Sequence, residues 1–281
     1  MKKNTNKYNK LRLVCICLVV CLVVIFFSCK TNIVSYDYGE LVYIDLDFED
    51  SNHSPWIASY TETTYDGEPH FKISNDTPSN GGNYSGRFYI GADGDYWLSP
   101  DTGRETARSE IKLKSTAQEG KEIYYSWYFK IDNNYVESDG FQIIGQFHDQ
   151  PDPAIGQSWN TYPAHSPPLS YNYINGEFII AVYSFEINHV SYIAAMPIEK
   201  GEWHHIKSRI YWSTTDNGFM EFWLDGNKIE ESGVSRYTAR NCFNKAGNYL
   251  NIGLYRSNDI DSLGMVYFDN IKSGPTYQSV E

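Results

Sequence analysis

The feature of this sequence that most restricts its fold is a long succession of short strand-like runs. After residue 40, runs rich in Val, Ile, Tyr, Phe and Trp are broken by Gly, Asn, Asp and Pro, without sustained helical periodicity. Within 124–131, Tyr125, Trp127, Phe129 and Ile131 alternate with other residues and therefore share one face of a strand. The runs predict strands at 41–48, 70–73, 86–90, 107–113, 122–131, 141–148, 169–174, 177–186, 190–196, 203–212, 218–224, 249–255 and 264–272.

The connections between these runs favour an antiparallel sandwich. Asn175-Gly176 and Asp225-Gly226 are typical of two-residue hairpin turns. Many closely spaced strands with such turns predict an all-β fold, a β-sandwich or jelly roll, and we expect one domain over 41–281. The Pro-rich segment 150–168 interrupts this rhythm. A loop of that length in a compact domain is usually functional, such as a wall or lid over a site.

The N-terminus has the features of an export signal. Five basic residues precede residue 13, and an apolar run of about 15 residues then leads to Ser28-Cys29. That run is shorter than the ~20 residues that span a bilayer. Ser28-Cys29 resembles the lipobox of bacterial lipoproteins, although Phe26 stands where Leu is commonest. We expect a signal peptide over 1–28, lipid on Cys29, a tether over 29–40 and attachment to the cell envelope, with the outer membrane as its place. An uncleaved membrane anchor is the alternative.

Charge and cysteine content exclude several classes of function. Without the five basic residues of the expected signal, 18 basic residues remain against 35 acidic ones, a net charge of −17. Such an acidic body is a poor partner for nucleic acid or for an anionic membrane surface. Cys242 would be the one unmodified cysteine, so the fold cannot rely on an internal disulfide. We expect Cys242 to be a small buried hydrophobic residue.

Polar residues at alternating positions on three runs are the candidates for chemistry. Arg108 and Glu110 share one face of a strand, and so do Gln146 and His148 on the run that enters the long loop. A third run presents the set Tyr249, Asn251, Gly253 and Tyr255. Taken singly, such residues are more often ion pairs, hydrogen-bonded histidines or packing tyrosines. Taken together, they could converge on one face of a sandwich.

These three segments, in this order, resemble the motifs of jelly-roll polysaccharide lyases. That group includes alginate lyases, with R-S-E-L-R, Q-I-H and Y-F-K-x-G-x-Y, and the heparin lyase I and glucuronan lyase types. The stretches 203–206 and 222–226 also resemble the heparin lyase I group and wider concanavalin-like folds. The resemblance covers about residues 41–275. The chain departs from the alginate lyase motifs at Asn251, where they carry Lys, and at Ile111-Lys112, where they carry Leu-Arg.

The resemblance implies β-elimination beside a uronic acid, with no metal or organic cofactor in the reaction. Gln146 and Arg108 would neutralise the uronate carboxylate, because the charge that develops there needs preorganised donors. His148 suits the base that removes the C5 proton, since imidazole, with an unperturbed pKa of ~6.5, is largely neutral near pH 7. Tyr255 suits the acid for the leaving oxygen, or both roles. The residues expected to line sugar subsites are Glu110, Asn251, Arg256, His165, Tyr171 and Tyr173.

The expected partner is therefore an anionic uronate polysaccharide of the glucuronan, alginate or a related type, bound by a monomer. The acidic body would repel it at long range, but a Debye length of ~8 Å at physiological salt confines that repulsion. Similar jelly rolls hold a structural Ca²⁺ between their first and last strands. Glu49 and Asp269 are the candidate ligands, although surface carboxylates that cap these strands are an equal alternative.

Two other functions fit the same fold. A laminarinase-like glycoside hydrolase needs two carboxylates about 5–5.5 Å apart for retention. The sequence offers no E-x-D-x-x-E strand in its middle, which disfavours this alternative. A non-catalytic glycan-binding lipoprotein would need the aromatic residues but not His148 and Tyr255. Fold alone cannot distinguish these functions.

Overall fold

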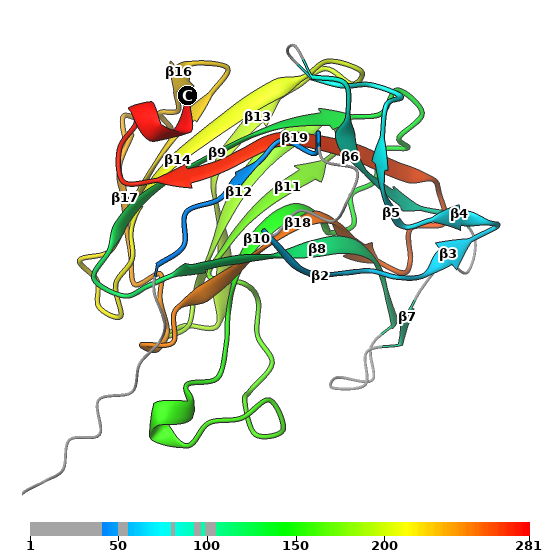
Figure 1. The fold of residues 1–281 in the computed structure, drawn as a ribbon. Coiled ribbons are helices and arrows are strands. Elements are labelled where there is room, and N and C mark those ends of the chain that lie inside the picture. Colours follow the sequence, from blue (N-terminus) through cyan, green and yellow to red (C-terminus); the bar gives the residue numbers. More distant parts are fainter. Residues whose placement is uncertain (1–40, 50–55, 80–81, 93–96, 99–104) are drawn as a thin grey trace, which may run out of the picture. The chain divides into compact units, whose positions relative to one another are not determined.

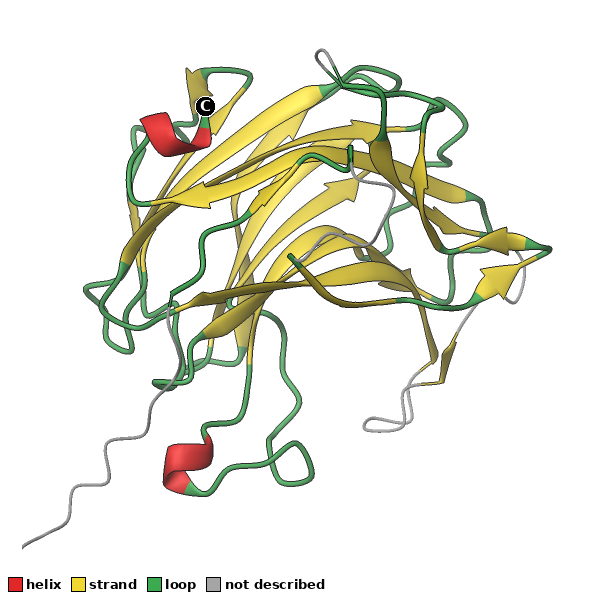
Figure 2. Cartoon of the chain, viewed as in Figure 1, coloured by secondary structure: helices red, strands yellow, loops and turns green. Residues whose placement is uncertain are grey.

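Two antiparallel sheets stacked face to face make up most of the protein in a computed structural model of the chain (Figures 1 and 2). The structure describes residues 41–49, 56–79, 82–92, 97–98 and 105–281. The expected signal peptide, Cys29 and the tether lie outside these residues. All described residues belong to one compact unit, and no helix among them is long and apolar enough to cross a membrane. The expected all-β sandwich is confirmed.

The first sheet, sheet A, lies uppermost in Figure 1. Its strand order in the described residues is β16 (Asn227–Lys228), β15 (Phe219–Leu224), β14 (His204–Tyr211), β9 (Glu122–Ile131), β19 (Gly264–Gly274), β6 (Ser85–Ile90) and β5 (Phe71–Ser74). Two short strands extend it, because β1 (Asp45–Leu46) pairs with β19 and β17 (Tyr237–Thr238) pairs with β15.

The second sheet, sheet B, carries the three polar segments. Its order is β13 (His189–Pro197), β12 (Glu177–Ser184), β11 (Leu169–Ile174), β10 (Gln142–Asp149), β18 (Asn248–Ser257), β8 (Glu105–Ala117) and β2 (Ile57–Tyr60), with β7 (Trp97–Leu98) beside β8. A separate pair, β3 (Thr64–Tyr65) and β4 (Glu68–Pro69), and the 3₁₀ helices η1 (Pro153–Ile155) and η2 (Gln278–Val280) complete the elements.

The longer strands and both hairpin turns match the expectations from sequence. Asn175 and Gly176 have φ of 51° and 80°, and Asp225 and Gly226 have φ of 51° and 79°, the left-handed values that these turns require. The differences concern short elements at the sheet margins. Of the expected strand 41–48 only β1 forms, and β2, β3, β4, β7, β16 and β17 were not expected. Strands this short carry too little alternation to be recognised.

Aromatic side chains fill the space between the sheets. The Trp127 indole of β9 packs edge-on against the Tyr171 ring of β11, with centroids 4.9 Å apart. Tyr125 of β9 packs in the same way on Phe147 of β10 at 4.7 Å. Each fully buried side chain of this size contributes about 1.5–3 kcal/mol to folding. The core therefore holds the inner face of sheet B in place and leaves its other face free for chemistry.

Candidate active site

Strand pairing brings the three polar segments together on the outer face of sheet B. β18 lies between β8 and β10 and pairs with both. Across β18 and β10, Asn251 lies opposite Gln146 and Tyr249 lies opposite His148. Across β18 and β8, Tyr255 lies opposite Arg108. We call this set of residues on β8, β10 and β18 the polar strip; it consists of Arg108, Glu110, Lys112, Gln146, His148, Tyr249, Asn251 and Tyr255.

Glu110 is the centre of hydrogen bonding in the polar strip. Its buried carboxylate accepts from Gln146 Nε2 at 2.6 Å and from Asn251 Nδ2 at 3.4 Å, and Arg108 Nε lies 3.2 Å from Glu110 Oε2. Three side chains from three strands are thus fixed by one anion. A carboxylate would repel a uronate, so this position favours a role for Glu110 in holding the donors.

Gly253 allows β18 to approach β8 closely enough for these contacts. It lies opposite Glu110 with φ of 136°, where the pairing of β10 with β18 also shifts register. A Cβ atom at this position would lie 2.2 Å from the Ser109 carbonyl oxygen and 2.7 Å from Glu110 Cα. Only glycine fits both this backbone conformation and this spacing.

One end of the polar strip pairs a cation with a phenol. The Arg108 guanidinium lies over the Tyr255 ring, 4.4 Å from its centroid. Burial favours the neutral form of Arg108, but the charge of Glu110 and the hydroxyl of Tyr255 outweigh it and raise the pKa of Arg108 above its usual value. The cation therefore lies directly against the phenol that is the candidate proton donor.

A second cation occupies the middle of the polar strip. Lys112 lies opposite Asn251, and its ammonium sits 3.8 Å from the centroid of the Tyr249 ring. Among the ion pairs of the described residues, none joins Lys112 to a carboxylate. Burial lowers the pKa of the Lys112 ammonium. A partly buried cation without a carboxylate partner is suited to an anionic ligand. Lys112 stands where the alginate lyase motif has its second arginine.

The other end of the polar strip holds His148 between two neighbours. Its ring stacks on Tyr249 with centroids 5.5 Å apart, and Nδ1 lies 3.2 Å from Asp149 Oδ1. The loop 150–168, which hangs below sheet B in Figure 1, reaches this end. Its Trp159, half exposed, packs edge-on against Tyr249 at 6.3 Å. The expected wall beside the site is therefore present, and Trp159 is an aromatic surface that the sequence did not single out.

Four of the residues expected at sugar subsites lie elsewhere. Tyr171 and Tyr173 are completely buried between the sheets, and Tyr171 OH bonds Ser208 Oγ at 2.7 Å. Arg256 is 1% exposed and donates to the carbonyl oxygens of Gly91 and Ser262. The expectation for these three residues is wrong because each lies on the core side of its strand. His165 of the loop has a side chain that is 6% exposed, lies beside Asp149 and is stacked with His148, so it is buried next to the polar strip and does not offer a surface to a sugar.

The calcium candidates do lie close together. A Cβ atom at Gly82 would lie 2.7 Å from Glu49 Oε1 and 3.8 Å from Asp269 Oδ2, so both carboxylates face the same glycine. Glu49 accepts from the backbone N–H groups of Asn83 and Tyr84 at 2.7 and 3.0 Å. Burial and the nearby Glu49 charge raise the pKa of Asp269. No cluster of three or more His, Cys, Asp or Glu suited to a metal occurs among the described residues.

Comparison with known proteins assigns the family. A family model described as polysaccharide lyase matches residues 72–272, which is most of the chain and includes the whole polar strip. The chain belongs to this polysaccharide lyase family. No curated protein matches the sequence.

This polysaccharide lyase is similar to several solved structures. An endo-β-1,4-glucuronan lyase from the fungus Trichoderma reesei superposes with a TM-score of 0.59 at 18% identity, covering 85% of this chain and 97% of that one. The alginate lyase AlgAT5 gives a TM-score of 0.48 at 15% identity, with coverage of 75% and 84%. Alginate lyase Aly36B gives 0.47 at 10% identity, with coverage of 84% and 97%. At these identities the glucuronan lyase shows that the fold is shared.

The composition of the polar strip separates the lyase from the hydrolase alternative. Glu110 is its one carboxylate, and three donors already hold that side chain. A retaining glycoside hydrolase needs a second carboxylate about 5–5.5 Å away. The described residues of the strip offer an imidazole and a phenol in its place. These groups suit proton transfer in a lyase.

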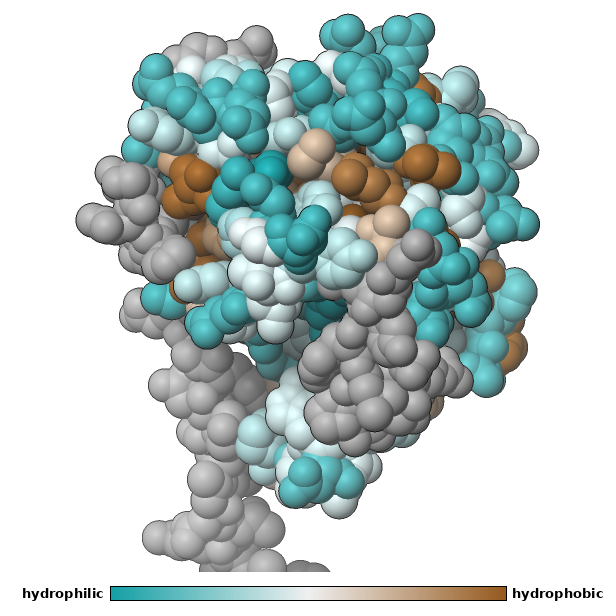
Figure 3. Space-filling view, turned by 90° about the vertical axis from the view of Figure 1, so that its right-hand side faces the viewer, coloured by the Kyte–Doolittle hydropathy of each residue, from teal (hydrophilic) through white to brown (hydrophobic). Residues whose placement is uncertain are grey.

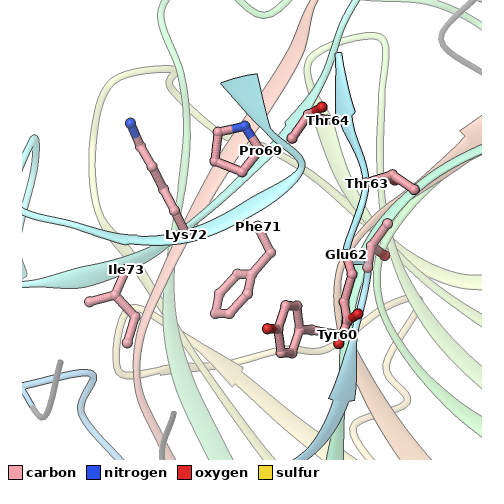
Figure 4. Close-up of a pocket in the computed structure, with 9 residues that line it drawn as sticks. Tyr60, Glu62, Thr63, Thr64, Pro69, Phe71, Lys72 and Ile73 are labelled. Atoms are coloured by element: carbon pink, nitrogen blue, oxygen red, sulfur yellow. The ribbon is translucent and has the colours of Figure 1, made fainter. Parts of the chain in front are cut away.

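A hollow of about 450 Å³ lies at the open edge of the sandwich, where its lining residue Thr61 is hydrogen-bonded to the backbone of Glu110. Figure 3 faces this edge, where apolar patches are separated by hydrophilic side chains. Figure 4 shows Tyr60 and Phe71 side by side in the hollow, and their rings pack with centroids 5.5 Å apart. Thr61, Glu62, Thr63, Thr64, Pro69, Lys72 and Ile73 complete its lining. The lining has no histidine and no residue of the polar strip, so the candidate base and acid of this lyase lie outside the hollow.

Proposed function

We propose that the protein cleaves a uronic-acid polysaccharide of the glucuronan, alginate or a related type by β-elimination at the polar strip. The observation that carries this proposal is that Arg108, Gln146, His148 and Tyr255 lie on one sheet face, where the Glu110 carboxylate holds Arg108 and Gln146. It is supported by the family match and by the glucuronan lyase fold. Two cations and two amides on this face suit a carboxylate-bearing sugar.

The substrate carboxylate binds in the middle of the polar strip. The Gln146 amide has two N–H groups, and only one is needed for Glu110, so the other can donate to the uronate. The Arg108 guanidinium and the Lys112 ammonium place two positive charges on the same face. These donors stabilise the charge that moves onto the carboxylate when the C5 proton leaves.

The two proton-transfer groups lie at opposite ends of the strip. His148 Nε2 takes the C5 proton, the electron pair forms the C4–C5 double bond, and the C4–O bond breaks. Tyr255 gives its proton to the leaving oxygen, and the Arg108 guanidinium over its ring stabilises the phenolate that remains. The products are a chain with an unsaturated uronyl end and a chain with a new reducing end. Trp159 offers a ring on which a neighbouring sugar stacks.

Ultraviolet absorbance tests this function directly. Protein beginning at about residue 31, mixed separately with glucuronan, alginate, ulvan and heparin-type polymers, should generate unsaturated uronyl ends from at least one of them. His148→Ala and Tyr255→Phe should each abolish the signal while circular dichroism stays unchanged. New reducing ends without absorbance would establish hydrolysis, and binding without cleavage would establish a glycan-binding protein.

We also propose that a lipid on Cys29 tethers the enzyme to the bacterial envelope as a monomer. The basic start, the apolar run and Ser28-Cys29 support this proposal. Expression of the full chain in a lipoprotein-processing bacterium with labelled palmitate should label the wild type and not Cys29→Ser. Equal labelling of both proteins would refute it. Light scattering of the soluble form tests the monomer.

A structural Ca²⁺ between Glu49 and Asp269 is a further proposal. Two neighbouring carboxylates, one of them buried with a raised pKa, fit a cation that would neutralise both. Backbone carbonyl oxygens would complete the coordination. Calcium should raise the melting temperature of the wild type, and Asp269→Asn should remove that response. A wild-type melting temperature that is the same in calcium and in chelator would leave the carboxylates as strand caps.

A further inference from the structure

We infer that Asp149 is a positioning residue that orients His148 and stabilises its protonated ring, and that the same carboxylate fastens the loop 150–168 beside the site. This inference rests on the proposed role of His148 as the base. It assigns a function to a residue outside the polar strip. Asp149 ends β10 and is completely buried, immediately after His148 in the chain.

Three side chains converge on the Asp149 carboxylate. Its Oδ1 atom lies 3.2 Å from His148 Nδ1 and 3.2 Å from His165 Nδ1. Its Oδ2 atom accepts a hydrogen bond from the Tyr162 hydroxyl. His148 belongs to β10, whereas Tyr162 and His165 belong to the loop. One anion therefore links the expected base to the segment that borders it.

The contacts determine which nitrogen of His148 carries the proton. Nδ1 lies 2.9 Å from the Asp149 backbone carbonyl oxygen as well as 3.2 Å from the carboxylate. Both oxygens can only accept, so Nδ1 must be the donor. In the neutral ring the lone pair then lies on Nε2. The side chain is 25% exposed, which leaves it open to a substrate on the polar strip.

Asp149 stays an anion while it does this. Burial alone would raise its pKa, but hydrogen bonds from His148, His165 and Tyr162 outweigh burial and hold the pKa well below its usual range. A fixed anion beside Nδ1 stabilises the imidazolium that forms when Nε2 takes the C5 proton. The proton stays on His148, and Asp149 does not receive it.

Three other titratable groups lie around the His148 ring. His165 of the loop is stacked with His148, with centroids 6.4 Å apart. Tyr249 of β18 stacks on His148 as well, and burial raises the pKa of this phenol, so it stays neutral near pH 7. Lys112 of β8 lies against Tyr249. The Asp149 carboxylate is the anion in direct contact with the His148 ring.

The loop is held by the same carboxylate and by its own packing. His165 stacks on Tyr183 with centroids 5.7 Å apart and meets the Phe243 ring edge-on at 5.3 Å. Asn244 Nδ2 donates to the Gln150 carbonyl oxygen at 2.6 Å. The loop therefore keeps several attachments without the charge of Asp149, so replacement by asparagine tests the charge more than the fold.

The experiment compares wild type, Asp149→Asn and the matched control Asp152→Asn. Asp152 is also buried and caps η1 by accepting from Ala154 N at 2.9 Å, a bond that asparagine can keep. Nitrogen-15 spectra of full-length, histidine-labelled protein should show His148 of the wild type with its proton on Nδ1; His148→Ala assigns the signal. In the Asp149→Asn variant, His148 should bind a proton about tenfold more weakly than in the wild type, because the neighbouring anion is lost. Asp152→Asn should match the wild type.

Kinetics supply the second readout. The acidic limb of kcat/KM should move to lower pH in Asp149→Asn by the same amount as the His148 titration, and kcat should fall about 100-fold, the usual range for an impaired general base. An unchanged His148 titration, or a change in KM alone, would overturn the inference and leave Asp149 as a loop anchor. Zinc retained by the wild type and lost from Asp149→Asn would also overturn it, because the ring nitrogens would then be ligands. Full activity in His148→Ala would instead refute the proposed base while the titration result stands.

Discussion

Glu110→Gln is the substitution that most directly tests how the polar strip is held together. Oε1 of Glu110 serves Gln146, and Oε2 serves both Arg108 and Asn251. In the variant, the amide nitrogen is best placed at the Oε2 position, since this keeps the short bond from Gln146. The contacts to Arg108 and Asn251 are then lost, because two donors would face each other.

The size of the effect follows from these contacts. A hydrogen bond to a charged group contributes about 1.5–3 kcal/mol to stability and a neutral one about 1 kcal/mol. The Arg108 side chain is 37% exposed, so water replaces part of the first contribution. We expect the free energy of unfolding to fall by about 2 kcal/mol. We also expect kcat to fall about tenfold or more, because Arg108 would no longer be fixed beside Tyr255.

Urea unfolding and the absorbance assay measure the two effects. Glu68→Gln is the matched control. The Glu68 side chain is half exposed, is not part of the polar strip and forms ion pairs with Arg87 and Lys72. The control should leave stability close to that of the wild type and activity intact, because water screens an exposed ion pair. If Glu110→Gln behaves like Glu68→Gln in both assays, the carboxylate is not the group that orders the strip.

Three other outcomes are expected. Tyr171→Phe removes the buried bond to Ser208 and should lower the free energy of unfolding by about 1 kcal/mol without a change in KM, as measured by urea unfolding and initial rates; a higher KM at unchanged stability would return Tyr171 to the sugar site. Lys112→Met should raise KM about fivefold, equivalent to about 1 kcal/mol, and weaken its dependence on salt. Lys112→Arg should restore both. Because the pKa of Asp149 is lowered in the folded protein, its contribution to stability is present above pH ~4 and is lost as the pH falls below it. Acid unfolding curves of Asp149→Asn should therefore show a weaker loss over that range than those of the wild type.

Strand alternation explains both what the sequence predicted and where it failed. The alternation at Gln146 and His148 and at Tyr249 to Tyr255 placed these residues on one outer face, and the structure does so. The same rule puts Tyr171 and Tyr173 with Leu169, and Arg256 with Leu254, on the inner face, where they are buried. Alternation along their own strands therefore contradicts the expectation that these three residues contact sugar.

Other features depend on contacts between distant segments. Asp149 directly precedes the Pro-rich loop and His165 lies near the end of that loop, and no spacing rule indicates that they meet. The use of Glu110 as a common acceptor depends on three strands from separate parts of the chain. A resemblance to short motifs identifies such residues but does not tell which of them contact sugar and which support the others.

The glycine at position 253 limits how this enzyme can be altered. Any side chain there would collide with the Ser109 carbonyl oxygen and push β8 away from β18. Arg108 would move with β8, whereas Gln146 and His148 would stay with β10. The distance between the Arg108 guanidinium and the His148 imidazole would therefore increase. Exchange of strand segments among related lyases should therefore transfer 249–255 intact with its glycine. Libraries that aim at new sugar specificity are better directed to Trp159 and the loop that carries it.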